Sequence, residues 1–178
     1  YYEQGADEIL YIDIVASLYE RHNLLDIVDK TTSAGVFIPI TVGGGVRKLD
    51  DVKELLRAGA DKVAINTAAT RDPTFITKAV EMFGSQCIVG SIDAKYKNGK
   101  WEAYVDNGRE PTGLDAIEWA QRLVELGVGE LLVTSIDCEG MKRGYDLELI
   151  RRIAEKVPVP VIGCGGAGSV DHLRQCLT

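Results

Sequence analysis

The stretch IPITVGGGVRKLDDVKELL, residues 38–56, contains the three parts of one strand, loop and helix unit. Its first residues form a continuous apolar run, which is typical of a strand buried on both faces. The apolar residues from Leu49 to Leu56 recur at helical spacing, which is typical of an amphipathic helix. Gly43, Gly44 and Gly45 connect the strand to the helix, so the role of these glycines depends on the fold in which this unit lies.

The same unit recurs along the chain. Apolar strands are predicted at EILYIDI (8–14), VFIPITV (36–42), KVAIN (62–66), CIVGSID (87–93), ELLVTSID (130–137) and PVIGCGG (160–166). Helices are predicted at Leu24–Ser33, Leu49–Gly59, Pro73–Phe83, Leu114–Leu126, Leu147–Val157 and from Asp171 onward. This alternation predicts an α/β protein with a parallel sheet covered by helices. One hairpin interrupts it, with a favoured two-residue turn at Asn98-Gly99.

An internal repeat selects a barrel over an open sheet. Residues 38–56 align with VPVIGCGGAGSVDHLRQCL, residues 159–177, which lies 121 residues further on. A repeat of about 120 residues with four strand and helix units implies a whole of roughly 240, the usual size of a (β/α)8 TIM barrel. We therefore expect residues 1–178 to form a single domain of duplicated half-barrels, truncated at both ends, with strands 2 to 7 visible.

Composition narrows the function. With 27 acidic and 20 basic residues, the net charge of -7 argues against nucleic acid as a partner. No apolar run reaches the roughly 20 residues of a membrane span, so we expect a cytoplasmic protein without a membrane partner. Four cysteines without C-x-x-C spacing predict reduced thiols, and with only two histidines a zinc site or histidine triad is not expected. We predict no metal and no cofactor.

The glycine loops are candidate phosphate sites. Gly43, Gly44 and Gly45 follow a strand and precede a helix, where backbone N–H groups and the helix dipole can hold an anion. The second copy has Gly165, Gly166 and Gly168, so two such loops predict a ligand with two phosphates. Asn66 and Thr67 follow the next strand and could add donors. The alternative is that the glycines only let strand and helix pack, and that Asn66 is an ordinary helix cap.

Charged residues mark both ends of the strands. Asp13, Asp93, Asp137 and Glu139 follow strands, where barrel enzymes carry their chemistry, and this predicts acid and base catalysis by carboxylates. Each of them could instead cap a helix. At the opposite strand ends lie Glu8, Lys62 and Glu130, for which the residues alone favour stabilising ion pairs.

The motifs come in the order and spacing of a known family. They are DEILYIDIVAS, TVGGGVR, RAGADKVAINTAA, FGSQCIV, IDAK, TGLDAIEWA, GELLVTSID, GYDLELIR and GGAG. Over essentially its whole length the chain resembles HisF, the cyclase subunit of imidazole glycerol phosphate synthase, a lyase of histidine biosynthesis. The resemblance implies a barrel that takes ammonia from a glutaminase subunit of the HisH type at its N-terminal face. It further implies that the barrel uses this ammonia to convert a phosphoribulosyl-formimino aminoimidazole carboxamide ribonucleotide to imidazole glycerol phosphate and aminoimidazole carboxamide ribotide.

The resemblance also implies roles for single residues. It assigns Gly45, Asn66 and Thr67 to one phosphate of the substrate and Gly140 and Gly166 to the other; Gly44 and Gly165 belong to the same loops. It makes Glu8, Lys62 and Glu130 three members of a charged gate through which ammonia enters the barrel. Asp93 matches the family cleanly as a site residue.

Departures from the family leave alternatives open. The family motif IDRDGTK reads IDCEGMK here, so Glu139 stands where an aspartate is usual and Cys138 and Met141 are also changed. Val15 replaces a threonine, and the family's other acid/base aspartate lies on a strand before this chain, so we expect the chain to be inactive alone. A HisF-like subunit that channels ammonia to amidate sugars of surface polysaccharides is one alternative. A non-catalytic fragment that pairs through exposed strand edges is another.

Overall fold

The computed structural model describes residues 1–14 and 23–177, so Val15 lies outside the described residues. The chain divides into two compact units, Tyr1–Val89 and Gly90–Thr178. Each unit is described by itself, and the prediction of one domain over residues 1–178 stays a prediction. In the described residues no helix is both long and apolar enough to cross a membrane.

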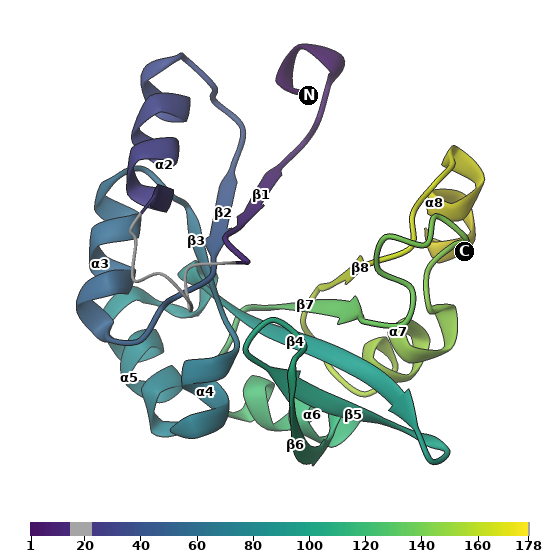
Figure 1. Ribbon diagram of the computed structural model, residues 1–178. Helices are drawn as coiled ribbons and strands as arrows, with labels where there is room; N and C mark the ends of the chain where they lie inside the picture. Colours follow the sequence, from purple (N-terminus) through teal and green to yellow (C-terminus); the bar gives the residue numbers. More distant parts are fainter. Residues whose placement is uncertain (15–22, 178) are drawn as a thin grey trace. The chain divides into compact units, whose positions relative to one another are not determined.

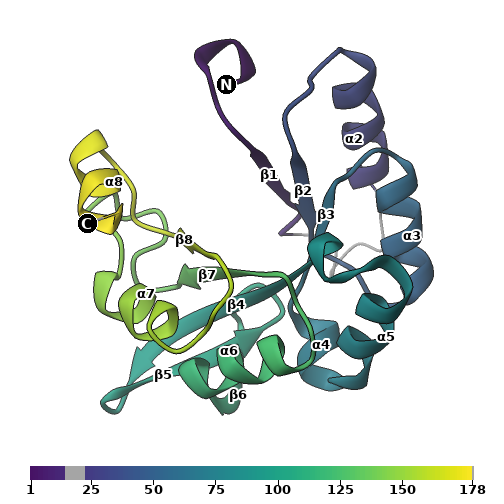
Figure 2. The same cartoon turned by 180° about the vertical axis from the view of Figure 1, so that it is seen from behind.

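The first unit is built on three parallel strands (Figure 1). They are β1 (Ile9–Ile12), β2 (Ile40–Gly43) and β3 (Lys62–Ile65), with β2 in the centre and all four of its residues buried. The helices are η1 (Tyr2–Gln4), α2 (Asn23–Ser33), α3 (Leu49–Arg57), α4 (Thr67–Arg71), α5 (Thr74–Phe83) and η2 (Ser85–Cys87). Both views place α2 and α3 along the same side of the strands (Figures 1 and 2).

The second unit combines antiparallel and parallel strands. β4 (Ile88–Lys97), which starts at the boundary, pairs antiparallel with β5 (Lys100–Val105), and β5 pairs antiparallel with β6 (Glu110–Asp115). β7 (Glu130–Ser135) pairs with β4 and lies parallel to β8 (Val161–Cys164). The helices are α6 (Ala116–Glu125), α7 (Leu147–Ala154) and α8 (Val170–Leu177). The predicted alternation of parallel strands and helices is confirmed in both units.

The antiparallel part differs from the prediction. The Asn98-Gly99 turn is confirmed, with Asn98 at φ 54° and Gly99 at φ 84°. The helix predicted from Leu114 instead begins at Ala116, because Asp115 caps it by accepting hydrogen bonds from the N–H groups of Ile117 and Glu118 at 2.9 and 3.2 Å. Residues 110–115 form β6, whose pairing with β5 outweighs the helical pattern. The short helix α4 was also not predicted.

The strand predicted from Val36 begins later, at Ile40. Pro39 precedes it and has no N–H group to donate to a ladder, although its carbonyl accepts a hydrogen bond from Ile9 N at 3.0 Å. The N–H of Ile40 donates to the Asp61 carboxylate at 2.8 Å. The strand therefore starts at the first residue whose backbone can pair on both sides.

Candidate active site

The first glycine loop follows β2 and is shaped by its contact with the residue after β1. Gly44 and Gly45 have φ angles of 103° and 70°, in the left-handed region that favours glycine. A Cβ on Gly44 would overlap the backbone of Asp13, whose N–H donates to the Gly43 carbonyl at 2.9 Å. A Cβ on Gly43 would lie 2.8 Å from Ile12 Cδ1. Close packing is therefore a sufficient reason for glycine at residues 43 and 44, even without a bound anion.

The second glycine loop follows β8 and repeats this geometry. Gly165 and Gly166 have φ angles of 95° and 92°. A Cβ on Gly165 would lie 2.8 Å from the carbonyl oxygen of Ser135, at the end of the neighbouring strand β7, and a Cβ on Gly166 would overlap the carbonyl of Gly144. The N–H of Gly168 donates to His172 Nδ1 at 3.1 Å. The packing interpretation of the glycines thus explains Gly165 and Gly166, and the amide of Gly168 already has a partner.

Two of the four predicted catalytic carboxylates lie near one half-buried thiol, that of Cys164, in the second unit. Burial raises the pKa of the Cys164 thiol, and the negative charges of Glu139 and Asp93 raise it further. Hydrogen bonds from Thr134 and from the Gly165 backbone oppose this rise. Glu139 Oε2 also lies 3.3 Å from the position of a Cβ on Gly165. The prediction that Asp93 follows its strand was wrong, because β4 continues to Lys97 by pairing with β5, so Asp93 lies within β4 opposite Tyr104. The middle of β4, the loop after β7 and the glycine loop after β8 therefore converge.

The other two carboxylates differ in setting. Asp137 is exposed, and its Oδ2 accepts a hydrogen bond from the backbone N–H of Tyr96 at 2.8 Å. Through this hydrogen bond, Asp137 connects the loop after β7 to β4. Asp13 is half-buried in the first unit beside Gly44, as its place after β1 predicts.

The remaining predicted phosphate residues lie at loop and helix starts. Asn66 is the residue before α4, but its side chain makes no capping hydrogen bond to that helix, which weighs against the ordinary cap. Thr67 is the first residue of α4 and is half-buried. Gly140 has a φ of 73°, and a Cβ there would meet nothing within 4 Å. Unlike Gly44 and Gly166, Gly140 is required by its backbone conformation and not by close contacts.

The predicted gate residues fall in both units. Lys62 Nζ donates to both oxygens of the Glu8 carboxylate, at 3.1 and 3.2 Å. Thr41 Oγ1 donates to Glu8 Oε1 at 2.6 Å. Glu8 precedes β1, and Lys62 begins β3, so parallel register brings them to one edge of the first unit's sheet. Glu130 begins β7 in the second unit.

Some polar residues of this region were not predicted. Cys164 lies opposite Thr134 in the parallel register of β7 and β8, and Thr41 completes the pair of Glu8 and Lys62. Ser135 is buried, and its hydroxyl has no hydrogen-bond partner among the residues that the structure describes. The signal available in the sequence was a polar residue in a strand that is otherwise apolar, as in ITVG and LLVTS. In the described residues no group of three or more metal-ligating side chains comes together.

The fold and these strand-end residues define the class first. Parallel strands alternate with helices, and the glycine loops and the carboxylates Asp13, Asp137 and Glu139 follow the strands, as in enzymes of the (β/α)8-barrel class. The model of the histidine biosynthesis protein family matches residues 1–178. Together with the relatives below, this match shows that the chain belongs to the histidine biosynthesis family, and within it to the HisF subunits of imidazole glycerol phosphate synthase.

The relatives are similar over nearly the whole chain. The imidazole glycerol phosphate synthase subunit HisF of Legionella pneumophila is 58% identical over 175 residues, which cover 98% of this chain and 82% of the relative. The HisF subunit of Trichormus variabilis is 53% identical over 182 residues, and that of Prochlorococcus marinus strain NATL2A is 51% identical over 181. Both alignments cover 100% of this chain and 70% of the relative. The family resemblance in the sequence is confirmed.

Proposed function

We propose that this chain carries most of the site of the cyclase reaction, in which ammonia and a bisphosphorylated formimino aminoimidazole carboxamide ribonucleotide give imidazole glycerol phosphate and aminoimidazole carboxamide ribotide. The observation that carries the proposal is the convergence of Asp93, Glu139 and Gly165 in the second unit. Asp93 and Glu139 hold and move protons as the imidazole ring closes, since carboxylates in different surroundings can serve as acid and base. No metal or organic cofactor enters this proposal.

Glu139 is the residue that most needs testing. Its exposed carboxylate lies on the loop after β7, one methylene further from the backbone than that of the usual aspartate. The turn at Gly140, open to solvent, leaves room for the loop to adjust. Gly140, Gly165 and Gly166 are proposed to bind one phosphate, and Gly44, Gly45, Asn66 and Thr67 the other. Asp13 and Asp137 complete the carboxylate set, with Asp137 acting through its tie to Tyr96.

The test compares two proteins. One is the 178-residue chain, which we propose is inactive alone because the resemblance puts the family's other acid/base aspartate before its first strand. The other is a hybrid in which the flanking segments of the Legionella pneumophila relative extend the chain at both ends. Each is mixed with the formimino ribonucleotide and an ammonium salt at alkaline pH, and loss of substrate absorbance is followed with product identification.

The expected result is turnover by the hybrid that falls by orders of magnitude in Asp93→Ala and in Glu139→Ala. Glu139→Asp restores the family residue and should retain turnover. Glu125→Ala is the matched control, since Glu125 is an exposed carboxylate on α6 that pairs with Arg122. A folded hybrid without turnover that still activates a glutaminase would instead support the sugar-amidating alternative.

The partner is proposed to be a cytoplasmic glutaminase subunit that docks at the N-terminal ends of the strands and delivers ammonia past Glu8, Lys62 and Glu130. The pair of Glu8 and Lys62 is only partly exposed and shares a hydrogen bond with Thr41, so its charges are held in place. In the hybrid, Lys62→Met should lower turnover with glutamine and glutaminase more than turnover with ammonium salt. Equal losses in both assays would contradict a gate role.

A further inference from the structure

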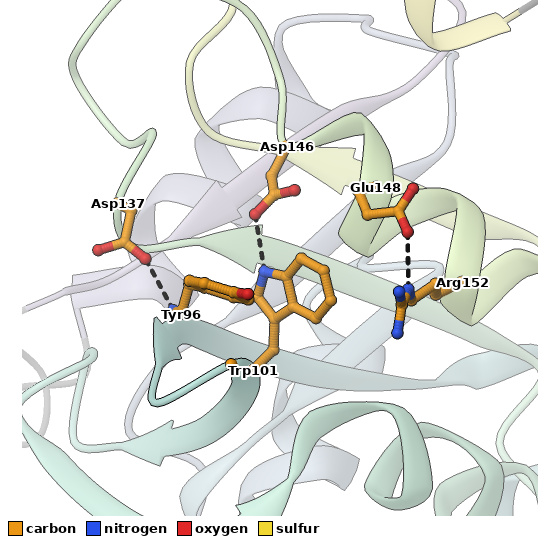
Figure 3. Close-up of a pocket in the computed structure, with 7 residues that line it drawn as sticks. Tyr96, Trp101, Asp137, Asp146, Glu148 and Arg152 are labelled. Atoms are coloured by element: carbon orange, nitrogen blue, oxygen red, sulfur yellow. Dashed lines mark hydrogen bonds and ion pairs between the residues drawn. The ribbon is translucent and has the colours of Figure 1, made fainter.

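The loop that carries Glu139 is tied at both ends to the hairpin of β4 and β5 (Figure 3). At its start, Asp137 Oδ2 accepts a hydrogen bond from the backbone N–H of Tyr96 at 2.8 Å. At its end, Asp146 Oδ2 accepts a hydrogen bond from the indole Nε1–H of Trp101 at 2.8 Å. The hairpin therefore holds both ends of the loop. Its only predicted catalytic residue is Asp93.

The hairpin side of these ties is rigidly built. Tyr96 and Trp101 are direct partners across the β4–β5 ladder, and their rings meet edge to face with centroids 4.9 Å apart. Trp101 is 7% exposed, and the guanidinium carbon of Arg152 lies 5.4 Å from its ring centroid. Glu148 holds Arg152 through a hydrogen bond of 2.7 Å (Figure 3). The indole is thus fixed from several sides.

The loop side is exposed and includes a strained residue. Glu139, Gly140 and Met141 are exposed, and Lys142 adopts a φ of 55°, which is strained for a residue with a side chain. The N–H groups of Cys138 and Glu139 share one acceptor, the carbonyl of Ser135. Met141 N donates to the Cys138 carbonyl at 3.0 Å, and Gly144 N donates to the Gly166 carbonyl at 2.8 Å. An exposed and strained loop keeps one conformation only when its surroundings impose it.

Asp146 has two roles that involve different oxygens. Its Oδ1 accepts a hydrogen bond from Leu149 N at 3.1 Å and so caps α7, while Oδ2 accepts the indole hydrogen. An N–H bond to a carboxylate is stronger than a bond between neutral groups. The contact with Trp101 therefore fixes where the loop ends and α7 begins.

We propose that Trp101 and Asp146 are a positioning pair that holds the loop with Glu139 in its working conformation. Neither residue touches the reacting atoms in this proposal; both act through the loop. The catalytic consequence rests on the proposed function, whereas the ordering of the loop does not.

Two substitutions break the pair differently. Trp101→Phe removes the indole donor and keeps an aromatic ring beside Tyr96. Asp146→Asn keeps an oxygen for Leu149 N and turns an NH2 group toward the indole, so it keeps the cap and loses the tie. The matched controls are Trp119→Phe, at the other of the chain's two tryptophans, and Asp115→Asn, at the equivalent cap of α6.

The first readout is loop ordering in the 178-residue chain. Lys142 and Arg143 are exposed trypsin sites within the loop, and mass spectrometry identifies cleavage there. Trp101→Phe and Asp146→Asn should each speed this cleavage about tenfold, as expected for loss of a hydrogen bond to a charged group. The double variant should be no faster than either single one, and the controls should change by less than about twofold. Unchanged cleavage in both single variants, or additive effects, would overturn the pair.

The second readout is spectroscopic. The chain has two indole N–H resonances, and Trp101→Phe identifies the one from Trp101. Asp146→Asn should move that resonance and speed its hydrogen exchange, whereas Asp115→Asn should leave it in place. No shift with Asp146→Asn would contradict the hydrogen bond.

The third readout is kinetic and uses the hybrid protein. Both pair variants should lower kcat by about tenfold to a hundredfold, as a catalytic group displaced by up to 1 Å does, with KM changed less than about threefold. An unchanged kcat in variants that loosen the loop would overturn the catalytic role of the pair. If the hybrid is inactive before any substitution, that result counts against the proposed function. The trypsin and indole-resonance experiments still test whether Trp101 and Asp146 position the loop.

Discussion

The two glycine loops have the same backbone geometry but different charges at the helix that follows. Gly44 and Gly165 occupy equivalent places in the repeat, with φ angles of 103° and 95°, and each lies against backbone at the end of a neighbouring strand. The repeat also aligns Asp51 with His172. Asp51 Oδ2 accepts a hydrogen bond from Arg47 N at 2.9 Å, and His172 Nδ1 accepts one from Gly168 N at 3.1 Å.

This difference separates packing from ligand binding. The same loop shape is kept where the accepting group is a buried carboxylate and where it is a half-buried imidazole. A carboxylate at a helix N-terminus already satisfies the partial positive charge that an anion would use, whereas a neutral imidazole does not. The glycines therefore set the shape of both loops, and the residue at the third position of the helix sets how much positive potential is left.

The largest expected effect comes from the glycines. Gly44→Ala places a Cβ on the Asp13 backbone at a positive φ, so it should lower the free energy of unfolding by about 3 kcal/mol or more. Gly99→Ala, also at positive φ but with nothing within 4 Å, should cost only about 1–2 kcal/mol. Urea unfolding measures both. Equal losses would mean that φ alone, and not the contact between loops, requires glycine at residue 44.

The capping carboxylate of the first loop should come next. Asp51→Ala removes the acceptor for the N–H groups of Arg47 and Lys48, so it should lower the free energy of unfolding by about 1–2 kcal/mol. Asp50→Ala, at the exposed neighbour, is the control and should change it by less than about 0.5 kcal/mol. Urea unfolding of both variants checks this. If Asp50→Ala lowered the free energy of unfolding more than Asp51→Ala, Asp51 would not be the capping residue of the first loop.

A smaller effect is expected when the second loop is made like the first. His172→Asp puts a negative charge at the start of α8, where the helix dipole favours it, and should slow amide exchange in α8 by an amount equivalent to about 0.3–1 kcal/mol. Asp171→Ala removes a carboxylate of the same turn and should have the opposite sign. Faster exchange in His172→Asp would show that the imidazole makes a contact that a carboxylate cannot replace.

The smallest effect concerns the position where the repeat has Gly43 in one loop and Cys164 in the other. Burial and the charges of Glu139 and Asp93 raise the pKa of the Cys164 thiol. The alkylation of Cys164 should therefore need a higher pH than the alkylation of a free cysteine, whose thiol has a pKa of about 8.5. Glu139→Gln removes a negative charge, so the midpoint should move down. The unfolded thiol ionises first, so stability should fall slightly above that ordinary pKa. If Glu139→Gln left the pH midpoint of alkylation unchanged, the charge of Glu139 would not act on the Cys164 thiol.

The sequence predicted the order of parallel strands and helices because buried parallel strands and amphipathic helices leave distinct periodic patterns. It also predicted the turn at Asn98-Gly99, because these residues adopt the turn's positive φ angles at low cost. It did not predict β6, since EPTGLD has little strand character and pairs only because β5 offers a ladder. The start of α6 was misplaced for the same reason.

The sequence by itself determined the family, the strand-end carboxylates and the duplicated glycine loops, because these depend on residue type and spacing along the chain. Only the tertiary structure decided which contacts those residues make. Gly44 makes room for Asp13, Glu139 lies near Cys164, and Trp101 donates to Asp146 across 45 residues of chain. Such contacts depend on strand register and on which loops meet, and no local pattern of residues encodes either.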